Sequence, residues 1–170
     1  MPDPETVVHR VGLQPLSPTT FAPYGAVFGE DALRFPEFDP DEGRVAFELF
    51  KMRSTKRFTR EAIGFHFSYT QPIIVLKGVL ALIVAPPPRD PKATLETADV
   101  DYERVAAFEV RGGEGVMLGR GVWHDMVSLE DDTTILHLVR RLTPERFSSP
   151  AESVNTRERD NTVIQLEVAG

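Results

Sequence analysis

The chain has 170 residues, of which 41% are hydrophobic and 26% charged, and this is the composition of an ordinary globular domain. Its 26 acidic residues outnumber its 19 lysines and arginines, so the formal net charge is −7. This balance argues against a nucleic-acid or anionic-membrane partner, because phosphate contacts require a basic surface. A small anionic substrate stays compatible with it, since one or two local cations suffice. The absence of cysteine excludes disulfides, thiolate metal sites and a cysteine nucleophile.

The N-terminal sequence MPDPETVVHRVGLQPL has no apolar stretch of the kind that secretory signals carry. The longest apolar run, VLALIVAPPP, is far shorter than the roughly 20 residues that a membrane-spanning helix needs. We therefore expect a cytoplasmic protein.

Residues 1–43 are expected to form a strand, a turn or short helix capped by Ser17, and an exposed acidic loop. The sequence RVAFELFKMR then alternates with period two, which is typical of a strand. This pattern places Phe47, Leu49 and Lys51 on one face of that strand.

Further short strands are expected along residues 44–142, which we interpret as a barrel core. FHFSYTQPIIVLKGVLALIVAPP predicts two strands around a turn at Lys77-Gly78, with Pro72 at a strand edge or bulge. VAAFEVRGGEGVMLGRGVWHDMVSL and DDTTILHLVRRL predict three more strands. Residues 143–170 are expected to form a polar loop and a closing strand, TVIQLEV. The pattern predicts one all-β domain over residues 1–170, a sandwich or small barrel.

Two histidines stand in glycine-rich frames whose spacing is informative. The intervals Gly113-x5-Gly119-x-Gly121-x2-His124 resemble the second cupin motif, in which glycines turn a barrel corner and a histidine then points inward. Upstream, His66-x4-Gln71 resembles the first cupin motif, with Gln71 at a glutamate position and Gly64 at that of a further histidine. The resemblance implies a cupin-type double-stranded β-helix, a small jelly-roll barrel.

The metal chemistry implied by these motifs is weakened in this chain. A divalent ion is held by neutral imidazoles together with at least one anionic oxygen. His66, Gln71 and His124 would form a neutral, weak three-ligand site. We therefore expect no required cofactor and a polar pocket that binds substrate directly, with a weakly bound divalent ion as the alternative.

Other polar residues near these motifs are candidates for substrate contacts. Arg120 offers a planar fork for a carboxylate, although it could equally be solvated. Lys51 is a second possible anion contact, and Tyr69 a possible acid–base or structural group. Trp123 is expected to point away from His124, into a core or subunit interface. His137 is evenly balanced between core and pocket.

Several stretches in order resemble the ureidoglycolate lyase family, a cupin-fold group of allantoin and purine catabolism. They are PLSPTTFAPYGAVF, GRVAFELFKMR, HFSYTQPIIVLKG leading into VAPPPRDP, and GRGVWHDMVSL, and together they cover roughly residues 13–130. Asp125 stands where the family often has a second histidine, and AIGF replaces a Glu-Arg pair before His66.

The resemblance implies cleavage of ureidoglycolate into glyoxylate and urea. His124 or His66 would act as the base, Gln71 would hold the ureido group, and Arg120 or Lys51 would bind the carboxylate. The alternatives are a non-catalytic or divergent cupin that binds a small carboxylate, and a metal-dependent cupin isomerase or dioxygenase. We expect a homodimer, because exposed edge strands need covering.

Overall fold

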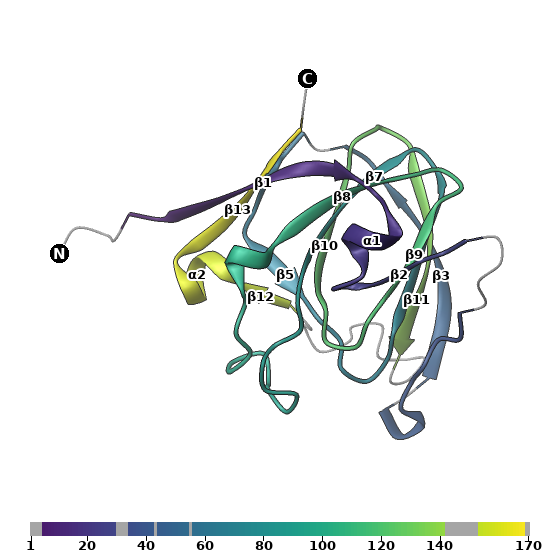
Figure 1. Ribbon diagram of the computed structural model, residues 1–170, viewed down its shortest axis with the longest axis horizontal. Helices are drawn as coiled ribbons and strands as arrows, with labels where there is room; N and C mark the ends of the chain where they lie inside the picture. Colours follow the sequence, from purple (N-terminus) through teal and green to yellow (C-terminus); the bar gives the residue numbers. More distant parts are fainter. Residues whose placement is uncertain (1–4, 30–33, 43, 55, 142–152, 169–170) are drawn as a thin grey trace.

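Two β-sheets face each other and curl around a common core in the computed structural model (Figure 1). The structure describes residues 5–29, 34–42, 44–54, 56–141 and 153–168. The prediction of an all-β fold is confirmed. One sheet has eight strands in the order β12 (Ser153–Asn155), β5 (Ala62–Gly64), β10 (Trp123–Ser128), β7 (Val79–Ala85), β8 (Ala106–Arg111), β1 (Val7–Pro15), β13 (Thr162–Glu167) and β4 (Thr59–Arg60). The other has five, in the order β2 (Gly25–Val27), β9 (Gly115–Leu118), β6 (Gln71–Lys77), β11 (Thr133–Arg141) and β3 (Arg44–Met52).

The helical elements are short and lie between strands or at their ends. They are α1 (Pro18–Phe21), α2 (Thr156–Asp160) and the 3₁₀ turns at Pro40–Glu42 and Tyr102–Arg104. Ser17 caps α1 as predicted, because its hydroxyl oxygen accepts a hydrogen bond from the Thr20 amide at 3.2 Å. No helix among the described residues is long and apolar enough to cross a membrane.

Alternation along the strands of the eight-stranded sheet produces two separate apolar clusters. Inward residues such as Leu82 and Phe108 form the cluster between the two sheets, together with Phe21 from α1. Outward residues such as Ile83 and Trp123 form a second cluster, which the segment 93–105 and β12 cover. Trp123 has no exposed surface, so the prediction that it points away from His124 into a core is confirmed.

The structure gives the detail of two expectations for the chain path. Pro72 lies in β6, an internal strand, but it pairs only with β9 there, because the pairing with β11 begins at Ile73. A proline is tolerated at that point since its missing N–H faces no ladder partner. The polar sequence expected to be loop forms β12 and α2 from residue 153 onward, whereas residues 142–152 lie outside the described part.

The closing strand is present as β13, which pairs in parallel with β1 at the far end of the eight-stranded sheet. The boundaries at 43 and 142 that we expect from the sequence stay predictions.

Candidate functional site

His66 and His124 come together on the inner side of the eight-stranded sheet. His124 lies on β10 opposite Val84 of β7 and Gly64 of β5, so the glycine at the expected histidine position is its direct neighbour. The centroids of the two imidazole rings are 5.0 Å apart. Both are partly buried. The histidines of the two sequence motifs therefore form one pair, as their spacing predicts for a barrel.

The glycine corner before His124 explains how the chain brings the two rings together. Gly121 has φ +75°, and its amide donates a hydrogen bond to the His66 carbonyl oxygen at 2.6 Å. A side chain at position 121 would collide with the ring of Phe67. Only glycine permits this close approach of the two backbones, and the approach sets the separation of His66 and His124.

The hydrogen bond of His124 determines which ring nitrogen can take up a proton. Its Nδ1 lies 3.0 Å from the Val122 carbonyl oxygen, which can only accept. Nδ1 therefore carries the hydrogen and donates, and in the neutral ring the lone pair is on Nε2. This arrangement makes Nε2 the basic atom of His124.

Tyr69 stacks on His66, with ring centroids 4.7 Å apart and an interplanar angle of 21°. Its side chain is buried, and its backbone pairs with that of Phe38 in an isolated bridge. The stack restricts rotation of the His66 ring, so Tyr69 positions the histidine pair.

Gln71 belongs to a row of polar side chains on the inner face of the five-stranded sheet. Its Nε2 lies 3.5 Å from His137 Nδ1, and His137 Nε2 lies 3.1 Å from Glu48 Oε2. Gln71 and His137 are almost completely buried, whereas the Glu48 side chain is 38% exposed. The sequence left His137 undecided, and the structure places it in this row.

The row and the histidine pair belong to the same region of the barrel. Gln71 follows Tyr69 by two residues, and two residues span at most about 7 Å of extended chain. Tyr69 contacts His66 directly. One continuous stretch of backbone thus presents His66, Tyr69 and Gln71 to the interior.

The donor set does not fit a tightly held divalent metal. In the part of the chain that the structure describes, no three His, Cys, Asp or Glu side chains are placed to bind one ion. Gly64 offers no ligand beside His124, and the Gln71 amide nitrogen faces His137. A neutral amide oxygen and two imidazoles lack the anionic oxygen that favours such an ion over water. We assign no reaction step to a metal.

Arg120 contacts two carboxylates, which is unfavourable for its expected role as the ligand of a substrate carboxylate. Its Nη1 donates to Asp39 Oδ1 at 2.9 Å and to the Phe67 carbonyl at 3.1 Å, and its Nε lies 3.5 Å from Glu37 Oε2. Two carboxylates already neutralise this guanidinium and would repel a substrate carboxylate. Arg120 instead links residues 37–39 to the segment after His66. We therefore do not assign it the contact with the substrate carboxylate.

Lys51 lies on the wrong face of its strand for the expected substrate contact. In β3, Glu48 points toward His137, so Lys51, three residues later, points to the opposite side. The side chain of Lys51 is exposed, as are Phe47 and Leu49 on the same outer face. Lys51 therefore lies on the outer face, away from the polar row that contains His137, and we do not assign it the anion contact.

Asp125, at the position of a second family histidine, points to the outer face of β10. It accepts hydrogen bonds from Arg60 Nε and Nη2, the latter at 3.2 Å, and both side chains are largely buried. This pair joins β10 to β4 and accounts for the carboxylate at that position.

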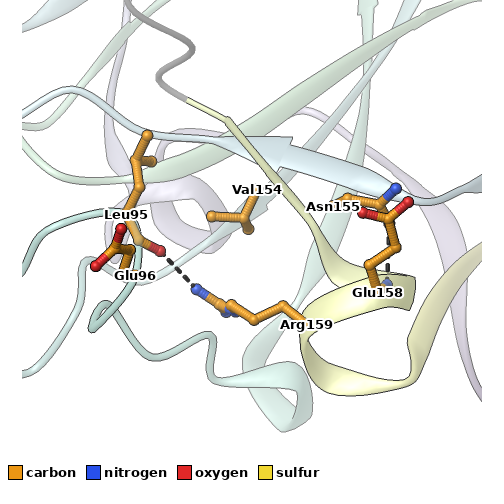
Figure 2. A pocket seen from close by; sticks show the side chains of 6 residues that line it. All are labelled: Leu95, Glu96, Val154, Asn155, Glu158 and Arg159. Carbon is orange, nitrogen blue, oxygen red and sulfur yellow. Dashed lines mark hydrogen bonds between the residues drawn. The ribbon is translucent and has the colours of Figure 1, made fainter.

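A separate hollow lies on the outer side of the molecule beside α2 (Figure 2), lined by Leu95, Glu96, Val154, Asn155, Glu158 and Arg159. Arg159 donates to the carbonyl oxygens of Leu95 and Ala98 at 3.1 and 2.8 Å and forms a double hydrogen bond with Asp160. Because this guanidinium is engaged by its neighbours, the hollow offers no evident cation for a ligand.

The ionisable groups next to that hollow stabilise one another. Burial and the hydrogen bond to Asp160 raise the pKa of Tyr102. Burial by itself would raise the pKa of Asp160, but hydrogen bonds from Arg159 and Tyr102 outweigh it and lower that pKa below its usual value. These shifts indicate a structural cluster, since each charge has a partner.

Sequence reasoning missed Glu48 and the loop at residues 37–39. Glu48 interrupts the apolar run VAFELF, and a charge in such a strand was the available signal. The loop looked like solvent-exposed acidic sequence, yet the Asp39 amide bonds to the Ser68 carbonyl and the Thr70 amide to the Glu37 carbonyl.

The chain matches one family model and is similar to several solved structures. Residues 33–160 match a family model described as ureidoglycolate lyase. Among solved structures, the chain is similar to a cupin-2 domain containing protein from Shewanella frigidimarina (16% identity, TM-score 0.37, covering 63% of this chain and 80% of that one). It is also similar to dTDP-4-dehydrorhamnose 3,5-epimerase from Bacillus anthracis (10%, TM-score 0.45, covering 65% and 57%). These likenesses concern the fold alone, and no curated protein matches the chain.

Proposed function

Because the chain belongs to the ureidoglycolate lyase family, we propose that it cleaves ureidoglycolate into glyoxylate and urea by acid–base elimination. The observation that carries the proposal is the imidazole pair of His66 and His124, with ring centroids 5.0 Å apart, inside the matched region. This reaction requires side chains that exchange protons near neutral pH, and histidine is such a side chain.

The first step is removal of the substrate hydroxyl proton. His124 Nε2 is the base, because its Nδ1 donates to the Val122 carbonyl and the lone pair is therefore on Nε2. As the proton leaves, the carbon–oxygen double bond of glyoxylate forms and the carbon–nitrogen bond breaks.

The second step is protonation of the departing nitrogen, which becomes part of urea. The reaction transfers one proton from oxygen to nitrogen overall, so a proton that one histidine takes up can be returned by that ring or by its neighbour. The short distance between His66 and His124 suits this transfer. Gln71 binds the ureido group, and its buried amide is the group that the family motif places there.

The test is glyoxylate release from racemic ureidoglycolate, corrected for spontaneous decay. We expect acceleration over the blank at micromolar protein. Folded protein without acceleration would remove the lyase proposal and favour the alternative of a cupin that only binds a small carboxylate.

The metal-dependent alternative makes a different prediction. A cupin isomerase or dioxygenase would carry iron, manganese or nickel in stoichiometric amount. Elemental analysis of the purified protein distinguishes this alternative from the lyase that we propose, for which we expect no required metal.

We also propose that the protein is a cytoplasmic homodimer with a small anionic substrate and no nucleic-acid or membrane partner. The outer face of the five-stranded sheet supports an assembly, because Phe47, Leu49 and Leu76 are 72%, 58% and 51% exposed there. Light scattering measures the mass in solution, and a monomer would contradict this proposal.

A further inference from the structure

The row formed by Glu48, His137 and Gln71 crosses three neighbouring strands of one sheet. His137 of β11 is directly opposite Glu48 of β3, and on its other side it pairs with Ile73 of β6. Gln71 lies two residues before Ile73, on the same face, as a diagonal neighbour. The row thus runs from a half-exposed carboxylate on an edge strand to a buried amide in the barrel.

The chemistry of these groups fixes the direction of their hydrogen bonds. An ionised carboxylate only accepts, so His137 Nε2, 3.1 Å from Glu48 Oε2, carries a hydrogen. In the neutral imidazole, Nδ1 then holds the lone pair. Its neighbour at 3.5 Å is the Gln71 Nε2, which donates to Nδ1 of the neutral ring. The carboxylate at the sheet edge therefore sets the orientation of the buried amide.

The consequence appears at the other end of the amide. The Oε1 atom of Gln71 is buried and has no hydrogen-bond partner among the described residues, and the Gln71 side chain is 4% exposed. Buried carbonyl oxygens are rarely left in this condition in native proteins, and each exception calls for an explanation. A ligand with an N–H group would supply the missing donor.

We propose that Glu48 and His137 are positioning residues that make Gln71 an obligate hydrogen-bond acceptor, so that the site selects a ligand with an N–H donor, such as a ureido or amide group. The inference rests on the proposed function for its choice of ureido ligand. It adds the reason why an amide at position 71 discriminates between ligands: without the carboxylate, the amide could turn over and present its NH₂ instead.

The experiment compares two stable probes that differ only in their hydrogen-bonding groups. N-carbamoylglycine carries the ureido N–H groups, and levulinate replaces NH by CH₂ and NH₂ by CH₃ at the same positions. Calorimetry on the full chain is expected to show wild-type protein binding N-carbamoylglycine at least about tenfold more tightly than levulinate, because a site with a buried polar group rejects a ligand that cannot pair with it.

The diagnostic variant is Glu48→Gln, which keeps the size of the side chain and removes the charge that fixes the His137 tautomer. We expect the preference for N-carbamoylglycine to fall to within about threefold. With ureidoglycolate, KM should rise about tenfold while kcat changes little, since the contact is made equally before and during the reaction. Lys51→Gln is the matched control, because Lys51 is on the same strand with its side chain on the outer face. This variant should retain the wild-type preference for N-carbamoylglycine and the wild-type KM for ureidoglycolate.

His137→Phe removes both ring nitrogens and tests the same point if Glu48→Gln melts below the wild type. The inference is overturned if the wild type shows no preference, or if the folded variants keep the wild-type preference. Neither probe has the hydroxyl group of the substrate, so binding is measured without turnover. A wild type that discriminates without releasing glyoxylate would remove the lyase proposal alone, and a lyase without discrimination would remove only this inference.

Discussion

Two polar clusters in this molecule, on opposite sides of the eight-stranded sheet, differ in how far their groups satisfy one another. Outside, Arg159, Asp160 and Tyr102 form hydrogen bonds of 2.6 to 2.7 Å among themselves. Inside, Gln71 leaves a buried carbonyl oxygen without a partner in the described structure. Closed networks stabilise a fold, whereas a buried acceptor without a partner, five residues after His66, is open to a ligand donor.

The degree of burial does not distinguish the outer side of the sheet from the inner side. Trp123 on the outer side and Gln71 on the inner side are both almost completely buried. The Trp123 Nε1 donates to the Asp99 carbonyl at 3.0 Å, and Arg159 lies 5.9 Å from the centre of its ring. The difference therefore lies in hydrogen-bond completeness, and substitutions in the two clusters should affect different measurements.

The largest effect is expected from Trp123→Ala on the outer side. The side chain has no exposed surface and packs edge-on against Phe65 with ring centroids 4.3 Å apart. Its removal leaves a large cavity and should lower the free energy of unfolding by about 3–5 kcal/mol. Chemical denaturation measures this change. A loss below about 1 kcal/mol would show that the apolar cluster around Trp123 is not a core of the fold.

His124→Ala on the inner side should act on the reaction instead. We expect glyoxylate release to fall by about 10²-fold or more, the contribution typical of a general base. The melting temperature should stay close to that of the wild type, because His124 is only partly buried. Activity that survived in the folded variant would exclude His124 as the base.

Asp160→Asn tests the closed cluster through its dependence on pH. The folded-state pKa of Asp160 is lower than the unfolded value near 3.8, so the ionised carboxylate stabilises the fold above that pH. The contribution is lost as the pH falls through the lowered folded-state pKa. The variant should lose about 1–3 kcal/mol at neutral pH.

Unfolding curves at pH 7 and at a pH below the lowered folded-state pKa of Asp160 measure this difference. The wild type and Asp160→Asn should converge in stability at the acidic end. A gap that stayed constant with pH would contradict the role of the ionised carboxylate.

Arg120→Gln should have the smallest effect. The guanidinium is 32% exposed, and its partners Glu37 and Asp39 are 70% and 49% exposed, so solvent screens both ion pairs. We expect a loss of about 0–1 kcal/mol in unfolding free energy. KM for ureidoglycolate should stay within about threefold of the wild type. A hundredfold rise in KM would restore Arg120 as the carboxylate ligand.

The parts of the site that could be predicted are those encoded by local spacing. Gly121 and His124 are three residues apart, and His66 precedes Gln71 by five, so corner, strand and inward side chain follow from short-range geometry. The remaining contacts could not be predicted, because Gln71 meets His137 across 66 residues and His137 meets Glu48 across 89. No local pattern specifies such pairings.

Lys51 is a second example of a placement that the sequence could not predict. Period-two alternation identifies the two faces of a strand but does not say which face meets the core, and in β3 both faces carry apolar residues. The face with Phe47, Leu49 and Lys51 is the outer one. Only the pairing of β3 with β11 decides this, since it places Glu48 beside His137.

The sequence by itself determined the all-β class, the Ser17 cap, the turn at Gly78 and the two histidine motifs, because propensity, turn chemistry and spacing act over a few residues. The tertiary structure decided which polar groups meet. It neutralised Arg120 with a distant acidic loop, turned Lys51 outward, and linked Gln71 through His137 to Glu48. Sheet register makes these decisions, since it places side chains from remote parts of the chain on one face.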